Sequence, residues 1–241
     1  MRVSTSIIQN AFGKYLKDVI DGKDVIITKN ERGVAKLVPY QDPMVTMVSE
    51  STAEYYLHRR VTFSEYLEIS NNSETRYELI DGELFLMASP THRHQVVIGE
   101  LLGQFYNYFK GKKCSALTAP FDVRLMNDSL RFEDDPNVVQ PDILVICDEE
   151  AIDEAGKYHG VPALVVEVLS PSTRSKDMVK KLSLYMLSGV KEYWIVDLEQ
   201  NQILVYAMHD KGVESLKVVA IGEMVQSKAF EGLVVDTREF A

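Results

Sequence analysis

The sequence has few cysteines and no long hydrophobic run, and both absences restrict the kind of protein that it can encode. Only two of its 241 residues are cysteines, which excludes a disulfide-rich scaffold. Cys114 and Cys147 each lie inside an apolar stretch, so we expect reduced core thiols in a cytoplasmic protein. No apolar run reaches the roughly 18 residues of a transmembrane helix, so we expect no membrane partner.

Basic residues are also scarce relative to acidic ones. The chain has 26 Lys and Arg against 36 Asp and Glu, a net charge of −10, which argues against a surface that coats nucleic acid broadly. The charge is uneven along the chain. Residues 1–45 have seven basic and five acidic residues, a net of +2, whereas the remainder has 19 against 31, a net of −12. This asymmetry indicates two parts.

The first part has the pattern of a small helix-hairpin module. Apolar residues recur at helical spacing over residues 7–20, and Asp21-Gly22 ends the predicted helix. Residues 25–28 and 34–38 flank a turn and predict a β-hairpin. About 40 residues are too few for a stable domain, so we expect a homodimer. The domains predicted are therefore a module over 1–42, a linker over 43–60 and a main domain over 61–241.

The main domain alternates between strand-like and helix-like segments, which predicts an α/β fold with a mixed sheet. Residues 77–80 and 83–87 flank Asp81-Gly82, a strong short signal for a β-hairpin. Ser89-Pro90-Thr91 precedes a long amphipathic helix. Residues 143–146 and 163–169 are short apolar runs typical of buried strands, and a helix is predicted over 176–187.

Two acidic residues lie where their chemistry is informative. Glu167 interrupts the apolar run 163–169, and a buried carboxylate is costly unless it is paired or binds a metal. Asp142 directly precedes the run 143–146, so adjacent strands would place both acids side by side. A divalent cation relieves their repulsion, and hard oxygen ligands favour Mg²⁺ or Mn²⁺ over zinc. Alternatives remain open for both residues. Asp142 could be a strand-start or turn residue, and Glu167 could form a structural salt bridge or lie on a strand with one solvent-exposed face.

At these residues the main domain resembles the Uma-two family of endonucleases. The matching segments are 140–145 (QPDILV), 166–173 (VEVLSPST) and 189–197 (GVKEYWIVD), together with Asp177, Lys181 and Tyr185. Residues 76–84 (RYELIDGEL) and Ser89-Pro90 with His94 resemble its N-terminal half. The resemblance covers about residues 61–208. It implies a PD-(D/E)XK, restriction-endonuclease-like core and Mg²⁺-dependent hydrolysis of phosphodiester bonds in DNA.

The sequence departs from the superfamily pattern at one position. That pattern has a lysine two residues after the second acid, but Leu169 stands there. The resemblance implies that a lysine of the next helix replaces it, and the matching residue is Lys181, with Lys180 as its competitor. Asp177 lies four residues before Lys181, so the two share a helix face, either at the site or as a surface ion pair.

The resemblance also implies roles for the matching residues. Asp142 and Glu167 would hold the metal with the Val168 carbonyl, and Lys181 would orient or help to deprotonate the attacking water. Glu78 is expected to be a further acid near the metal, with a solvent-facing strand position as the alternative. The remaining candidates, expected to contact substrate, are His94 and Asp177. For His94 the alternative is a helix cap.

The first 40 residues resemble the prevent-host-death (Phd/YefM) antitoxins through Val3-Ser4, the apolar helix and the segments 25–29 (VIITK) and 34–39 (VAKLVP). Members of that family dimerise, bind operator DNA and usually wrap a toxin with their C-terminal tail. The resemblance implies DNA, a second copy and a toxin-type protein as partners. Candidate phosphate contacts are Arg2, Lys14 and Lys29, unless these are ordinary surface charges. Gln9 stands where the family often has an arginine, which weakens the expectation of DNA binding.

Two functions are therefore open. The first is a Mg²⁺-dependent endonuclease that acts on DNA and carries an antitoxin-like module. The second is a non-catalytic DNA-binding or antitoxin-like regulator built on a degenerate nuclease fold, motivated by Leu169 and by the acidic main domain. Uptake of a divalent metal discriminates between them.

Overall fold

The computed structural model separates the chain into two compact units, residues 1–51 and 52–241, which are described one at a time. The structure describes residues 2–10, 12, 14, 15, 19, 25–29, 32–37, 60–127, 131–171 and 173–240. The predicted linker over 43–60 lies outside the described residues, apart from Arg60.

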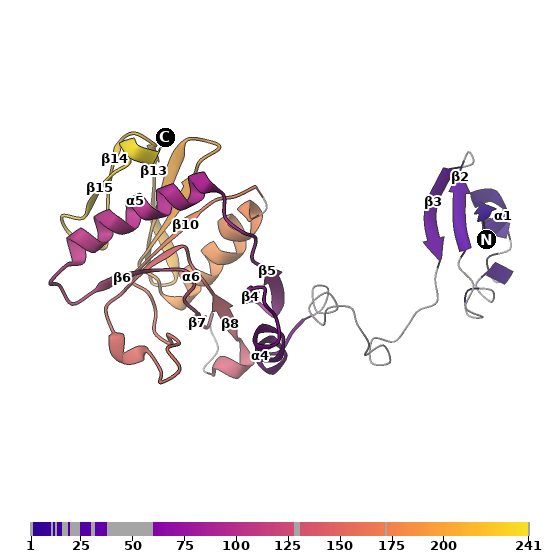
Figure 1. Cartoon of the computed structure of the whole chain (residues 1–241), viewed down its shortest axis with the longest axis horizontal. Helices are drawn as coiled ribbons and strands as arrows, with labels where there is room; N and C mark the ends of the chain where they lie inside the picture. The colour runs from indigo at the N-terminus through magenta and orange to yellow at the C-terminus, as the bar shows by residue number, and fades with distance from the viewer. Residues whose placement is uncertain are drawn as a thin grey trace. The chain divides into compact units, whose positions relative to one another are not determined.

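The N-terminal unit is a three-stranded sheet with a helix (Figure 1). Its elements are β1 (Arg2–Ser4), α1 (Thr5–Asn10), β2 (Val25–Lys29) and β3 (Arg32–Leu37). Strand β3 pairs antiparallel with β2, which confirms the predicted hairpin, and β1 pairs parallel with β2 on its other side. The sequence did not predict β1, because three residues are too few to show an alternating pattern.

The main unit is built on a six-stranded mixed sheet in the order β13-β12-β11-β10-β9-β6. Strands β10 and β11 are parallel and the other neighbours are antiparallel. The strands are β6 (Ser115–Thr118), β9 (Ile143–Ile146), β10 (Leu164–Val168), β11 (Glu192–Asp197), β12 (Gln202–His209) and β13 (Gly212–Ala220). The predicted mixed α/β fold is confirmed.

Helices cover the two faces of this sheet (Figure 1). On one face the long helix α5 (His92–Phe109) packs Phe105 against Trp194, with ring centroids 5.6 Å apart. On the other face α6 (Leu182–Ser188) contributes Tyr185 to a second apolar cluster. In β10, Val166 and Val168 face α5. Glu167, which lies between them, therefore faces α6. No helix in the described part of the chain is long and apolar enough to cross a membrane.

A smaller four-stranded sheet lies beside the first, in the order β5-β4-β8-β7. Asp81 and Gly82 have φ angles of 51° and 73°, as a two-residue hairpin turn between β4 and β5 requires, so this predicted hairpin is also confirmed. The elements of this region are α4 (Phe63–Asn71), β4 (Tyr77–Ile80), β5 (Glu83–Leu86), β7 (Val123–Leu125) and β8 (Asn137–Val139).

The remaining elements are short. After the large sheet, β14 (Met224–Gln226) and β15 (Val234–Asp236) form a two-stranded antiparallel sheet. Single 3₁₀ turns are formed by η1 (Phe132–Asp134), η2 (Glu149–Ala151) and η4 (Arg238–Phe240).

The helix that follows β10 differs from the prediction. Arg174 and Ser175 are α-helical, the next six residues, η3 (Lys176–Lys181), are π-helical, and the chain is α-helical again from Leu182. A π-helix has a wider turn than an α-helix and is frequent at functional sites. The periodicity of apolar residues could not reveal this difference, because the π-helical segment extends over little more than one turn.

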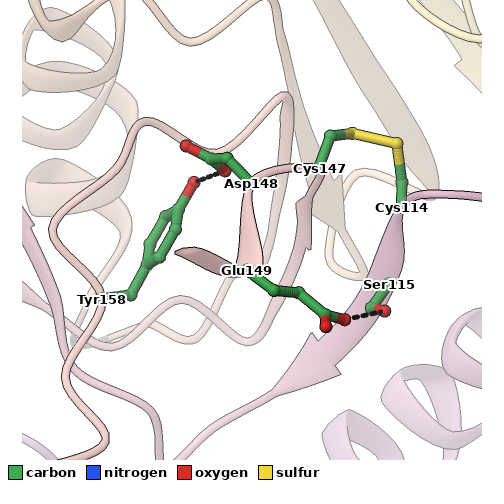
Figure 2. Close-up of a disulfide and its surroundings, with 6 residues drawn as sticks. All are labelled: Cys114, Ser115, Cys147, Asp148, Glu149 and Tyr158. Atoms are coloured by element: carbon green, nitrogen blue, oxygen red, sulfur yellow. Dashed lines mark hydrogen bonds between the residues drawn. A yellow bond between two sulfur atoms is a disulfide. The ribbon is translucent and has the colours of Figure 1, made fainter. Parts of the chain in front are cut away.

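The two cysteines correct the expectation of reduced thiols, because the structure joins Cys114 and Cys147 by a disulfide (Figure 2). Cys114 immediately precedes β6 and Cys147 immediately follows β9. The antiparallel register pairs Ser115 with Ile146, so one further step places the cysteines opposite each other, with Cα atoms 4.1 Å apart. A separation of 33 residues in the chain conceals this pairing from a reading of the sequence.

Candidate active site

A cavity of about 600 Å³ opens beside the adjoining ends of β9 and β10. The strand ends form one wall, and the N-terminal turn of α5 and the π-helix η3 form two others. Its charged lining residues are Arg76, Arg93, His94, Asp142, Glu167, Lys176, Asp177, Lys181 and Glu199. Several residues singled out in the sequence therefore meet in one place.

The strand register brings the two central acids together. Strands β9 and β10 are antiparallel, with Ile143 opposite Val166. One step further along each strand, Asp142 lies beside Glu167, and paired residues of antiparallel strands direct their side chains to the same face of the sheet. The expectation that adjacent strands place these acids side by side is met.

Asp142 is fixed through only one of its two carboxylate oxygens. The Val168 N–H donates to Oδ2 at 2.8 Å, and His94 Nε2 lies 3.2 Å from the same oxygen. No described residue donates a hydrogen bond to Oδ1. The Thr91 side chain caps α5, so the His94 ring is not the cap and instead contacts Asp142.

Glu167 shows the same division between its two oxygens. Oε1 accepts hydrogen bonds from Lys181 Nζ at 2.7 Å and from the Tyr185 hydroxyl at 2.9 Å. Among the described residues Oε2 has no donor, although the residue is only 4% exposed and lines the cavity. The role of Tyr185 was missed, because its sequence context indicated only packing of the helix on the sheet.

Lys181 rather than Lys180 enters the site. Its ammonium lies 2.8 Å from Glu78 Oε1 and 3.7 Å from Asp177 Oδ1, in addition to the contact with Glu167, and the side chain is 2% exposed. The pair with Asp177 is therefore buried and is not a surface ion pair. Lys180 points away and pairs with Glu83 at 3.0 Å. Leu169 packs in the apolar cluster on the α6 face, so the amino group beside Glu167 comes from η3.

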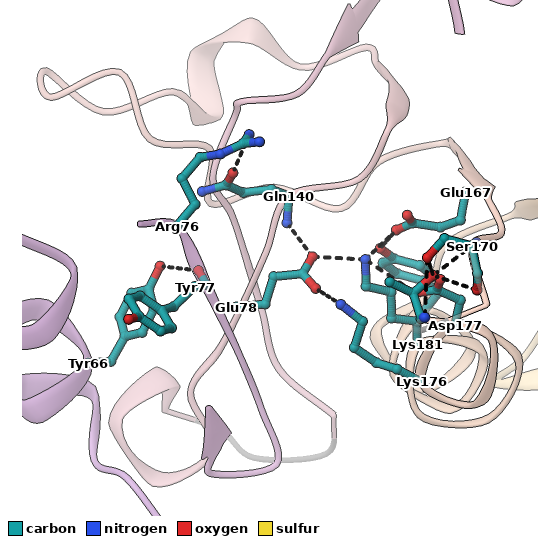
Figure 3. Close-up of polar contacts among 12 residues, drawn as sticks. Tyr66, Arg76, Tyr77, Glu78, Gln140, Glu167, Ser170, Lys176, Asp177 and Lys181 are labelled. Atoms are coloured by element: carbon teal, nitrogen blue, oxygen red, sulfur yellow. Dashed lines mark hydrogen bonds and ion pairs between the residues drawn. The ribbon is translucent and has the colours of Figure 1, made fainter. Parts of the chain in front are cut away.

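Glu78 is fully buried, which overturns its alternative as a solvent-facing strand residue. Oε2 of Glu78 accepts a hydrogen bond from Lys176 Nζ at 2.5 Å, and Oε1 accepts one from the Gln140 backbone N–H at 2.9 Å (Figure 3). Lys176 was missed by the sequence analysis. It lies five residues before Lys181, a spacing that brings two side chains together across a π-helical turn.

The two carboxylates that share Lys181 ionise differently. Burial opposes ionisation of Glu78, but the charges of Lys181 and Lys176 outweigh it and lower the pKa of Glu78 from 4.5 to about 2. Burial raises the pKa of Glu167 to about 8 despite Lys181, because Asp177, Asp142 and Glu78 add negative charge nearby. Glu78 has two ammonium groups beside it, whereas Glu167 shares Lys181 with Glu78 and Asp177, so Glu167 is the carboxyl whose charge calls for a second cation.

The neighbouring groups follow the same electrostatics. Burial disfavours the charge of Lys181, but Glu167, Glu78 and Asp177 raise its pKa well above the ordinary value. Burial likewise raises the pKa of Asp177. For His94 the hydrogen bond and the charge of Asp142 outweigh burial and raise the pKa of the imidazole.

The carboxylate oxygens in the cavity are suitable ligands for a hard divalent cation. The carboxylate oxygens without a hydrogen-bond donor, Asp142 Oδ1 and Glu167 Oε2, belong to neighbouring strand ends that line the cavity. Within the described residues no group of three or more His, Cys, Asp or Glu side chains is arranged to hold a metal. Mg²⁺ is usually held by one or two carboxylates, with waters and substrate phosphates as its other ligands, so two carboxylates meet this requirement.

The remaining candidates lie in the N-terminal unit. Arg2, Lys14 and Lys29 are all exposed there, and β1 and β2 place Arg2 beside Ile26, three residues from Lys29. Their exposure fits either a phosphate contact or ordinary surface charge, so their role stays a prediction.

Comparison with known proteins identifies the family of the main unit. A family described as "Uma2: Putative restriction endonuclease" matches residues 63–238. The chain belongs to the Uma2 family. The predicted resemblance of the main domain is confirmed, and the nuclease class of the family supports a nuclease. The match begins at residue 63, so the antitoxin-like resemblance of the first 40 residues stays a prediction.

Two relatives of this Uma2 chain agree with the assignment. "Uncharacterized protein slr1290" of Synechocystis sp. is 28% identical over 149 residues, which is 61% of this chain and 74% of that protein. The crystal structure of "a putative nuclease belonging to DUF820" from Anabaena variabilis superposes with a TM-score of 0.59 and 18% identity. It covers 75% of this chain and 97% of the other. At that identity the likeness shows the shared fold.

Proposed function

We propose that the chain is a Mg²⁺- or Mn²⁺-dependent endonuclease that hydrolyses phosphodiester bonds in DNA. The observation that carries the proposal is the pair of carboxylate oxygens, Asp142 Oδ1 and Glu167 Oε2, that enter one cavity without hydrogen-bond donors from the described residues. Lys181, which lies against Glu167, supports it. Membership of the Uma2 family supplies the reaction class.

The protein side chains would divide the chemistry among them. Asp142 and Glu167, with the Val168 carbonyl, would hold the cation, which polarises the scissile phosphate and acidifies a water when bound. Lys181 anchors Oε1 of Glu167, which leaves Oε2 for the cation, and places positive charge near the phosphate. Substrate contact is assigned to His94 and Asp177.

Glu78 does not line the cavity and acts through two lysines that do. Its carboxylate contacts both Lys176 and Lys181, so it keeps two ammonium groups charged in a buried place. We assign Glu78 to positioning the lysines, because none of its described contacts reaches Asp142 or Glu167 directly.

The test is cleavage of supercoiled plasmid and of labelled oligonucleotides with Mg²⁺ or Mn²⁺. We expect Asp142→Asn and Glu167→Gln each to lower the rate by about 100-fold or more, since each removes a metal ligand. Glu83→Gln is the matched control, because Glu83 pairs with Lys180 at the surface and should leave the rate unchanged. Undiminished cleavage by both site variants would reject the assigned site.

The non-catalytic regulator remains the second candidate, favoured by one observation. Three carboxylates surround Lys181 Nζ, and an ammonium so enclosed is suited to holding a fold together. Binding of DNA without cleavage, together with no heat of Mg²⁺ or Mn²⁺ binding in calorimetry, would favour this candidate over the nuclease.

For the N-terminal unit we propose an antitoxin-like role, with self-association, DNA contact through Arg2, Lys14 and Lys29, and a toxin-type protein as a further partner. The exposure of the three cations supports it. In the full-length chain, the combined substitution of all three by Gln should weaken binding to operator-like DNA and leave the oligomeric state in solution unchanged. Unaltered binding would leave the unit as a dimerisation element only.

A further inference from the structure

Two arginines of the cavity carry positive charge that no described carboxylate neutralises. Arg93 makes no hydrogen bond or ion pair with any described residue, and Arg76 donates only to the side-chain oxygen of Gln140, at 3.4 Å. Both side chains line the cavity and both residues are exposed. This is unusual in its setting, because residues 46–241 contain 31 acidic against 19 basic residues. A guanidinium that stays unpaired among so many carboxylates is available to an external anion.

The other cations of the cavity differ in this respect. Lys176 contacts Glu78, and Lys181 contacts Glu78, Glu167 and Asp177. Their charges are already balanced within the protein. The positive charge available to an approaching polyanion is therefore that of Arg76 and Arg93, which together are called the rim of the cavity below.

The two arginines occupy defined places on the rim. The Arg76 carbonyl accepts the Met87 N–H at 2.9 Å, just before β4 begins. The amide of Gln140 is oriented from its other end, where Nε2 donates to Asp122 at 2.7 Å, so its oxygen faces Arg76 (Figure 3). Arg93 lies in the first turn of α5, immediately before His94, which contacts Asp142.

We propose that Arg76 and Arg93 bind phosphates of the substrate other than the scissile one, so that the substrate is a polynucleotide rather than a mononucleotide or a small phosphodiester. The proposal rests on the proposed nuclease function. The guanidinium group matches phosphate oxygens with two parallel hydrogen bonds, and it keeps its charge at every relevant pH. Contacts of this kind position a nucleic acid without reading its bases, and they locally offset the repulsion of an acidic domain.

Binding of a fluorescent oligonucleotide, measured in EDTA across a series of salt concentrations, tests the proposal without cleavage. Each neutralised phosphate contributes about 0.7 to 0.9 to the slope of log affinity against log salt. We expect Arg76→Gln and Arg93→Gln each to lower the slope by about that amount and to weaken binding roughly 5- to 20-fold at low salt. Nucleoside monophosphate at an equal phosphate concentration should not displace the oligonucleotide.

Lys113→Gln is the matched control. Lys113 is exposed, lies beyond the far end of α5 from Arg93, and loses the same single charge. An equal fall in slope for this variant would mean that net charge alone acts at long range, and would overturn the proposal. Slopes unchanged in both arginine variants would overturn it as well. Arg93→Lys should restore the slope but only part of the affinity, because lysine lacks the paired donors.

The outcome is separable from that of the proposed function. If the wild-type protein cleaves DNA with Mg²⁺ while both arginine variants bind as it does, the rim proposal fails and the nuclease stands. If neither Mg²⁺ nor Mn²⁺ supports cleavage, the nuclease fails. Lowered slopes in the arginine variants would then still locate the DNA-binding surface at the cavity. Urea denaturation of each variant confirms that the fold is intact.

Discussion

A single ammonium group, Lys181 Nζ, contacts Glu78, Glu167 and Asp177, which come from β4, β10 and η3. These elements belong to two different sheets and to the helix between them, so one residue links them electrostatically. Such a buried cluster is costly to desolvate, and its cost is reduced because each of the three carboxylates has an ammonium group within 4 Å. Removing one member leaves the remaining buried charges uncompensated, which lowers the free energy of unfolding.

This cost can be measured with two neighbouring lysines. Lys181→Gln leaves buried carboxylates without their cation, and we expect a loss of about 3–5 kcal/mol of unfolding free energy. Lys180→Gln removes only a surface contact with Glu83, and we expect a change within about 0.5 kcal/mol. Urea denaturation of both variants checks the difference. Equal losses would contradict the central position of Lys181.

The depressed pKa of Glu78 makes a prediction about acid stability. Its pKa is lowered from 4.5 to about 2 by Lys181 and Lys176 against the effect of burial, so its ionised form stabilises the fold above about pH 4.5. That stabilisation is lost as the pH falls from about 4.5 toward 2, and it corresponds to roughly 3 kcal/mol at about 1.4 kcal/mol per pKa unit.

The comparison that isolates this group is with Glu78→Gln. The difference in unfolding free energy between wild type and variant should be largest at pH 6 and should shrink steadily between pH 4.5 and 2.5. A difference that stays constant over this range would show that Glu78 is not the titrating group. Urea denaturation followed by tryptophan fluorescence is suitable, because Trp194 is fully buried in the main unit.

His94 is expected to orient Asp142, in addition to the substrate contact proposed for it. Its Nε2 lies 3.2 Å from Asp142 Oδ2, and partners that orient a metal ligand typically contribute 10- to 100-fold to metal affinity. We expect His94→Asn to weaken Mn²⁺ binding by about that factor in calorimetry. His92 is exposed in the same turn of α5, so His92→Asn should bind Mn²⁺ as the wild type does. Equal affinity for both variants would contradict this role of His94.

At the scale of secondary structure elements, turns and registers decide how the site is assembled. Gly82 has a positive φ of 73° in the β4–β5 turn, a conformation that costs a side chain about 1–2 kcal/mol. We expect Gly82→Ala to destabilise the main unit by about that amount. Gly99 lies inside α5 with open space around its Cα, so Gly99→Ala should stabilise by about 0.5–1 kcal/mol. Thermal unfolding of both variants checks the opposite signs.

The sequence predicted the elements whose signals are local. Asp81-Gly82 marked a hairpin by its turn chemistry, and Ser89-Pro90-Thr91 marked the start of α5, where the structure shows Thr91 as the cap. Glu167 stood out because a carboxylate in an apolar run is costly. Each of these inferences depended on neighbours within a few residues.

The features that were missed depend on distant partners. Cys114 and Cys147 face each other only through the pairing of β6 with β9, and Glu78 reaches Lys176 across 98 residues of chain. The π-helical turn of η3 was missed because its spacing differs from that of an α-helix by less than one residue per turn. Sequence periodicity does not carry information on which strand pairs with which, so these contacts required the structure.

At the scale of the whole molecule, the charge distribution acquires a physical meaning. The acidic main domain would repel a nucleic acid as a whole, while Arg76 and Arg93 present local positive charge at the cavity. A negative surface with a confined basic rim limits non-specific binding and makes productive contact depend on one place. Charge is therefore uneven within the main unit too, with two unpaired arginines at the cavity of an otherwise acidic domain.

A divalent metal should couple the site to the stability of the whole main unit. A ligand that binds only the folded state adds about 2.7 kcal/mol at a concentration 100 times its dissociation constant. For a unit of this size each kcal/mol raises the midpoint of thermal unfolding by roughly 2–4 °C, so saturating Mn²⁺ should raise it by about 5–10 °C. EDTA should reverse the shift.

The variants Asp142→Asn and Glu167→Gln should unfold at the same temperature with and without Mn²⁺, since each lacks one of the oxygens assigned to the cation. Glu83→Gln, whose carboxylate pairs with Lys180 outside the cavity, should respond to Mn²⁺ as the wild type does. Calorimetric scans of the four proteins provide the measurement. A shift that persists in both site variants would place the cation elsewhere in the chain, because the two carboxylates lie on neighbouring strands and each is needed for the proposed site.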